Sequence, residues 1–138
     1  AIVNIENTFG IDYKDLDRYM ALVSVGHDRK DDNIVIKYGS MAYKIQQDSK
    51  SNPQSPLLEF ALYQAFINQE KFNDALGIIE ALNGVEMDKT QRARQKYLLG
   101  TVYSKLWRDE DASKAYGESV KADENSPWAK LAQSALKI

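Results

Sequence analysis

The sequence contains no cysteine, only three prolines and only seven glycines in 138 residues. The absence of cysteine excludes disulfides and thiolate metal sites, although it leaves the redox compartment open. So few prolines and glycines leave little room for the turns of a loop-rich β fold, and the apolar segments are longer than strands usually are. These shortages favour an all-helical chain.

The sequence also lacks long apolar runs and a charge excess of one sign. No run approaches the roughly 20 apolar residues that a membrane-spanning helix needs, and the N-terminus lacks the basic-then-apolar order of a signal peptide. The formal net charge is −2, which gives no reason to expect strong attraction to nucleic acid or to an anionic membrane. We therefore expect a water-soluble chain that does not insert into a membrane.

Helix start and stop signals divide the sequence into paired segments. Asp12 and Asp88 stand where N-cap residues are expected, and Pro56 stands at a first helical position. Asn83-Gly84 has the composition of a left-handed helix stop. With apolar residues at helical spacing, these signals predict one domain over residues 1–138, with helical hairpins at about 13–47, 56–83 and 88–122 and a final helix at about 127–137.

The third hairpin carries a recognisable motif. Leu99, Gly100 and Tyr103 fall on one face of its first helix, while Ala112 and Tyr116 fall on one face of its second. Gly100 lets the partner helix approach closely, and Ala112 is the small residue at the crossing. The pattern resembles the tetratricopeptide repeat, with its signature W-x₂-L-G-x₂-Y…A-x₃-F…P. The resemblance implies an all-α, right-handed stack of three antiparallel helical hairpins, an α-solenoid, with the C-terminal helix as its cap.

The other two hairpins match the signature less closely. The small crossing residue of each hairpin is predicted to be Ile34, Ala75 and Ala112, with spacings of 41 and 37 residues. Tyr63 stands where the repeat has glycine. A stack of helical hairpins without repeat ancestry stays open as the alternative.

The family resemblance also implies a binding surface. In tetratricopeptide proteins the first helices of successive hairpins line a concave groove that holds a peptide or a partner helix. The residues carried over to that groove are Phe60, Gln64, Ile67, Asn68, Arg94, Tyr97, Thr101 and Lys105. Their mixture of aromatic, amide and basic groups suits recognition of a peptide or helix, but it lacks the cationic clamp of chaperone-binding relatives. Phe60 and Tyr97 fit the core equally well, and both readings stay open.

Two further features of the sequence have residue types that occur in catalytic, metal or nucleic-acid sites. His27, the only histidine, lies near Asp28, Asp31 and Asp32, but one histidine with mobile carboxylates lacks a defined ligand set. Residues 88–109 hold six basic and two acidic side chains, a balance of +4, without the interleaved aromatics that stack on bases. We therefore predict no catalytic residue, metal site or cofactor. The alternative is a small helical enzyme or nucleic-acid-associated protein that uses His27 or the basic helix 89–105.

The predicted function is a non-enzymatic module for protein–protein interaction or scaffolding. Its partner is another protein, bound as a peptide or helix, and the chain can itself be an oligomer or assembly subunit. Residues 123–132 are similar to the close of repeat proteins of the bacterial envelope, among them the paralysed-flagellum proteins of flagellar motors. This resemblance implies a bacterial envelope or flagellar assembly and a periplasmic location. A start at Ala1 rather than Met suggests either processing of an exported protein or an excised piece of a longer chain. A cytoplasmic location stays open.

Overall fold

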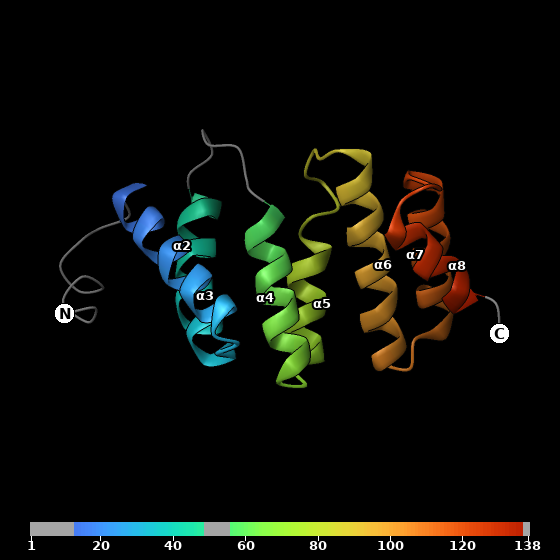
Figure 1. Cartoon of the computed structure of the whole chain (residues 1–138). Helices are drawn as coiled ribbons and strands as arrows, with labels where there is room; N and C mark the ends of the chain where they lie inside the picture. The colour runs from blue at the N-terminus through green and yellow to red at the C-terminus, as the bar shows by residue number, and fades with distance from the viewer. Residues whose placement is uncertain (1–12, 49–55, 137–138) are drawn as a thin grey trace. The chain divides into compact units, whose positions relative to one another are not determined.

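The computed structural model describes residues 13–48 and 56–136. Within these ranges the chain forms α-helices and no strand, which confirms the predicted all-α class. The helices, labelled in Figure 1, are α2 (Tyr13–Asp28), α3 (Asp32–Asp48), α4 (Pro56–Asn68), α5 (Phe72–Glu80), α6 (Lys89–Lys105), α7 (Asp109–Ala122) and α8 (Pro127–Leu136). The predicted cap at Asp12 and the segment 49–55 lie outside the described residues.

The chain divides into two compact units, which fall within residues 1–69 and residues 70–138. The right-handed stacking of hairpins and the single domain stay predictions.

Three of the helix connections have the same length and the same unusual backbone conformation. Each has three residues: 29–31 between α2 and α3, 69–71 between α4 and α5, and 106–108 between α6 and α7. The middle residue of each is left-handed, with φ of 57° at Lys30, 58° at Glu70 and 62° at Trp107. Left-handed φ is uncommon for residues other than glycine. The recurrence of one such turn supports a repeated helix–turn–helix unit.

These turns set the register between the three segments. Glu70 follows Lys30 by 40 positions, and Trp107 follows Glu70 by 37. Five residues after each turn residue stand Val35, Ala75 and Ala112, which are 3%, 0% and 4% exposed. The predicted crossing residue Ile34 was therefore one position early, because the turn that fixes the register contains no glycine to mark it.

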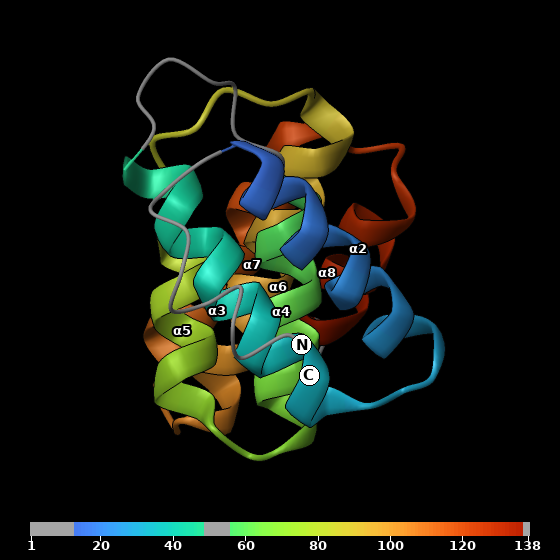
Figure 2. The ribbon, with the colours of Figure 1, turned by 90° about the vertical axis from the view of Figure 1, so that its left-hand side faces the viewer.

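Unit 1 is built from α2, α3 and α4. Helices α2 and α3 lie side by side (Figures 1 and 2), and the rings of Tyr19 and Tyr38 stack between them with centroids 6.0 Å apart. Gly39 of α3 allows α4 to approach, since a Cβ there would lie 2.7 Å from Leu62 Cδ2. Helix α2 also contacts α4 directly. The three helices therefore share one core.

Unit 2 is centred on α6, which packs against α7, while α8 contacts both. Gly100 of α6 lies against the ring of Tyr116 on α7, where a Cβ would come within 2.6 Å of two ring carbons. The Ser119 hydroxyl, fully buried, donates to the carbonyl of Ala93 at 2.7 Å. The close approach of α6 and α7 therefore depends on a glycine, as the motif predicts.

A glycine packs against a larger side chain both in the α2–α3 pair of unit 1 and in the α6–α7 pair of unit 2, but the glycine lies on a different helix of each pair. Val23 and Gly100 each stand seven residues before the left-handed turn residue, while Gly39 and Tyr116 each stand nine residues after it. In unit 1, a Cβ on Gly39 would lie 3.6 Å from Val23 Cγ2. The pair keeps one small and one large partner, but the glycine is on the second helix in unit 1 and on the first helix in unit 2.

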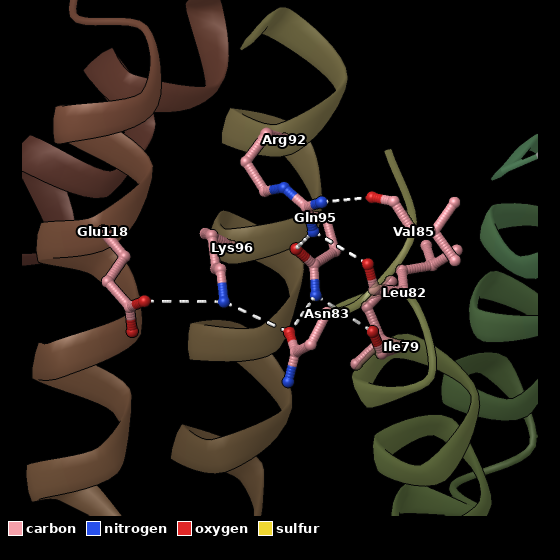
Figure 3. A network of polar contacts seen from close by, with 8 residues as sticks. All are labelled: Ile79, Leu82, Asn83, Val85, Arg92, Gln95, Lys96 and Glu118. Carbon is pink, nitrogen blue, oxygen red and sulfur yellow. Dashed lines mark hydrogen bonds and ion pairs between the residues drawn. The ribbon is translucent and has the colours of Figure 1, made fainter. Parts of the chain in front are cut away.

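A polar network in unit 2 caps the end of α5 (Figure 3). Gln95, fully buried on α6, donates to the carbonyl of Ile79 at 3.1 Å and to Asn83 Oδ1 at 2.7 Å. Arg92 donates to the carbonyls of Leu82 and Val85. Gln95 thus supports the last turn of α5, and Arg92 holds the connection that follows it.

The predicted left-handed stop at Asn83-Gly84 is wrong, because no described glycine has positive φ. Helix α5 ends at Glu80, and the carbonyl of Ile79 in its last turn accepts from Gln95 of α6.

Candidate functional site

A pocket of about 250 Å³ lies at one end of unit 1. It is formed by the last turn of α2, the following connection, the first turn of α3, and α4. Its lining residues are Gly26, His27, Lys30, Asp32, Val35, Ala61, Gln64, Ala65 and Asn68. Sites for drug-sized ligands usually measure about 300–1,000 Å³. This pocket is therefore suited to a side chain or a short stretch of backbone.

A chain of hydrogen bonds orients the amide groups of the pocket. Gln64 Nε2 donates to Asn68 Oδ1 at 2.8 Å, and Asn68 Nδ2 donates to Asp32 Oδ1 at 3.1 Å. The second oxygen of Asp32 accepts from Gln69 Nε2 at 3.3 Å. Both carboxylate oxygens of Asp32 are thus engaged. The side-chain oxygen of Gln64 has no hydrogen-bond partner among the residues that the structure describes, so it can accept a hydrogen bond from a ligand.

The predicted residues Gln64 and Asn68 therefore lie together in a pocket, while their two companions on α4 do not line it. Phe60 is only 3% exposed, which favours the core reading that the sequence left open for it. Ile67 is half-buried and is not among the lining residues.

The predicted residues on α6 belong to unit 2 and pack largely within it. The Arg94 guanidinium carbon lies 5.1 Å from the centroid of the Trp128 ring, and the Tyr97 ring lies 6.1 Å from the same centroid. Tyr97 also contacts the Tyr116 ring at 5.8 Å. Burial lowers the pKa of Arg94. Arg94 and Tyr97 thus hold α8 against α6, which favours the core reading for Tyr97.

Thr101 and Lys105, further along α6, have different environments. The Thr101 hydroxyl donates to the carbonyl of Tyr97 at 3.1 Å, one turn earlier in the same helix, and the residue is half-buried. Lys105 is exposed in the last turn.

Most of the cationic side chains of α6 make contacts within unit 2. Arg92 holds the end of α5, and Arg94 covers the ring of Trp128. Lys96 donates to Asn83 Oδ1 at 3.1 Å and forms an ion pair with Glu118 at 3.5 Å (Figure 3). Of the predicted cationic side chains, Lys89 and Lys105 are exposed. This arrangement does not favour α6 as a basic surface for nucleic acid.

Sequence reasoning missed the part of the pocket contributed by α2 and α3. His27 lies in the last turn of α2, which ends at Asp28. Lys30 and Asp32 line the same pocket. The left-handed turn at Lys30 brings these residues toward α4, and because no glycine marks that turn, the sequence carries no signal for it. Among the described residues, no group of three or more histidine, cysteine or acidic side chains is placed to hold a metal ion.

A buried carboxyl group lies elsewhere in unit 1, between α3 and α4. Glu59 is 1% exposed, and its Oε1 accepts from Gln46 Nε2 at 2.8 Å. Its second oxygen is buried without a hydrogen-bond partner. Burial raises the pKa of Glu59 above its ordinary value, against the opposing effect of its hydrogen bonds. Burial, together with the nearby Glu59 charge, also raises the pKa of Tyr43. This group affects stability rather than ligand contact, because it does not line the pocket.

No protein-family model matches the chain, and no curated protein matches it. Membership of the tetratricopeptide family therefore stays a prediction. Within the described residues, no helix combines the length and apolar character needed to cross a bilayer.

Proposed function

We propose that the chain is a non-enzymatic interaction module that binds a segment of another protein at the pocket of unit 1. The observation that carries this proposal is the pair of amide side chains, Gln64 and Asn68, held in fixed orientations at the wall of the pocket. An amide group can both donate and accept hydrogen bonds, so it can pair with the backbone of an extended peptide.

The size and lining of the pocket favour binding of a peptide over binding of a drug-sized small molecule. Its walls combine apolar surface from Val35, Ala61 and Ala65 with polar groups from α2 and α4. This combination fits one peptide side chain together with the adjoining backbone. The place of the module in a bacterial envelope or flagellar assembly stays a prediction from the sequence resemblance.

The test is selection of random peptides displayed on phage against the immobilised chain, followed by affinity measurement on the selected sequences. The double variant Gln64→Ala/Asn68→Ala should lose most of the binding, because it removes both amide groups from the pocket. Both residues are exposed, so their replacement leaves the core intact. The matched control is Gln47→Ala/Asn33→Ala, which removes two exposed amides of unit 1 that do not line the pocket. Equal binding by both double variants would place the recognition surface elsewhere.

A further inference from the structure

Trp107 is the most exposed of the large apolar side chains that the structure describes, with 88% of its surface accessible. It occupies the left-handed middle position of the turn between α6 and α7. The same position is Lys30 in the first such turn and Glu70 in the second, so the turn itself does not require an aromatic residue. Exposure of a large aromatic surface to water is unfavourable. The indole therefore has no evident purpose within its own unit and is available to a partner.

The residues around Trp107 hold it in a defined position. The Arg108 guanidinium carbon lies 4.6 Å from the centroid of the Tyr103 ring, and Arg108 Nη2 lies 2.8 Å from Asp111 Oδ2. The backbone N–H of Trp107 donates to the carbonyl of Ser104 at 3.1 Å. A side chain presented from a fixed backbone loses little conformational freedom on binding, and tryptophan is enriched among the residues that dominate interfaces.

The pocket of unit 1 suits an uncharged ligand. Lys30 and Asp32 bring opposite charges to its lining, and with His27 neutral the lining has no net charge. The amide groups that donate to Asp32 orient its carboxylate without cancelling its charge. The pocket therefore gives no advantage to an acidic or a basic side chain, and an indole, which carries no charge, matches it.

The apolar walls and the available acceptor of the pocket also fit an indole. The apolar part of the lining consists of Gly26, Val35, Ala61 and Ala65. The side-chain oxygen of Gln64 accepts no hydrogen bond within the described part of the chain. An indole has an apolar body and a single N–H donor with no acceptor. The volume of about 250 Å³ is enough for one such side chain.

We propose that Trp107 of one copy of the chain inserts into the unit 1 pocket of a second copy, where its indole N–H donates to the side-chain oxygen of Gln64. The inference rests on the proposed function and names the partner whose segment the pocket binds. The two surfaces are different parts of the chain, so the contact is heterologous and joins copies head to tail. One aromatic side chain buries about 150–250 Å², well below the roughly 1,200 Å² of a stable interface. The association is therefore weak and needs a high protein concentration.

The first experiment is sedimentation velocity of the full chain at concentrations from about 10 μM to about 1 mM, the range of weak association. The sedimentation coefficient of the unchanged chain should rise with concentration, and that of Trp107→Lys should stay at the monomer value. Lysine is the residue of the first left-handed turn, so this variant keeps the backbone conformation. The matched control is Leu131→Lys, which removes another exposed apolar side chain of unit 2 and should associate like the unchanged chain.

The second experiment mixes two defective variants. Trp107→Lys keeps an intact pocket, whereas Ala61→Phe keeps Trp107 and fills its own pocket with a ring. Each variant alone should stay monomeric, and an equimolar mixture should contain dimers but nothing larger, because only one productive contact is left. Gln64→Ala, which keeps the apolar walls, should weaken the association of the otherwise unchanged chain about threefold to tenfold through loss of one hydrogen bond.

The outcomes separate this inference from the function on which it rests. A chain that stays monomeric up to about 1 mM, or an association that survives Trp107→Lys, overturns the inference. So does an association that Trp107→Lys abolishes but both pocket variants keep, because Trp107 then docks elsewhere on the second copy. In each of these cases the proposed function stands if the displayed peptides still depend on Gln64 and Asn68. If neither the peptides nor the association depend on the pocket residues, both proposals fail.

Discussion

Replacement of Gly100 by alanine should destabilise unit 2, because there is no room for a methyl group between α6 and α7. A Cβ at this position would lie 2.6 Å from Tyr116 Cδ1 and Cε1 and 3.0 Å from Cγ. Carbon atoms in favourable contact are about 3.5–4.0 Å apart, so the ring would have to move by roughly an ångström. The ring cannot move freely, since it also packs against Tyr97.

The expected magnitude is the difference between two opposing effects. Overpacking a close contact costs about 1–3 kcal/mol, whereas alanine gains roughly 0.5–1 kcal/mol over glycine in a helix interior. The free energy of unfolding should therefore fall by about 1 kcal/mol for Gly100→Ala, and by more for Gly100→Leu.

The assay is urea denaturation followed by circular dichroism, with Gly117→Ala as the matched control. Gly117 lies within α7, and a Cβ there would meet no atom within 4 Å. That control should raise the free energy of unfolding by about 0.4–1 kcal/mol. If Gly100→Ala were as stabilising as Gly117→Ala, the close helix contact in unit 2 would be refuted.

Two further stability predictions follow from buried polar groups. Because the folded pKa of Glu59 is raised, its contribution to stability is greatest at pH values below its ordinary pKa and declines as the pH rises through the folded pKa. Glu59→Gln should therefore raise the melting temperature at neutral pH and flatten its decline with pH, and the exposed Glu70→Gln should do neither. Gln95→Leu should lower the free energy of unfolding by about 1–3 kcal/mol, because buried groups lose their partners, and should speed hydrogen exchange at the end of α5. The exposed Gln133→Leu, measured by the same urea titration and exchange experiment, should change neither; equal effects would contradict the capping role.

The helices were predictable because their signals are local. Pro56 begins α4 as expected, and the Asp88 side chain accepts from the backbone N–H of Gln91 at 2.8 Å to cap α6. The apolar spacing also gave the all-α class. Each of these signals lies within a few residues of the helix end that it marks.

The features that were missed depend on residues distant in the sequence. The end of α5 could not be located from Asn83-Gly84, because no left-handed glycine ends the helix and Gln95 and Arg92 of the next helix hold the following connection in place. Gly39 lies on the second helix of its hairpin, whereas the motif has its glycine on the first helix, as at Gly100.

Only part of the candidate site was predicted, because the pocket also contains residues that are distant in the sequence from α4. The family resemblance grouped Gln64 and Asn68 on one surface, and both residues line the pocket. It could not show that His27 and Lys30 line the same pocket, because a non-glycine left-handed turn brings them there. It also could not distinguish groove from core for Phe60, whose burial depends on its neighbours in space.

Titration of the ¹⁵N-labelled chain with a selected peptide, followed by NMR, tests the binding site most directly. The side-chain amide signals of Gln64 and Asn68 can be observed individually, together with the backbone signals of residues 26–32. Binding at the pocket predicts saturable shifts of these signals and small shifts on α7 and α8. Shifts that concentrate on α7 or α8 and leave the signals of Gln64 and Asn68 unchanged would contradict it.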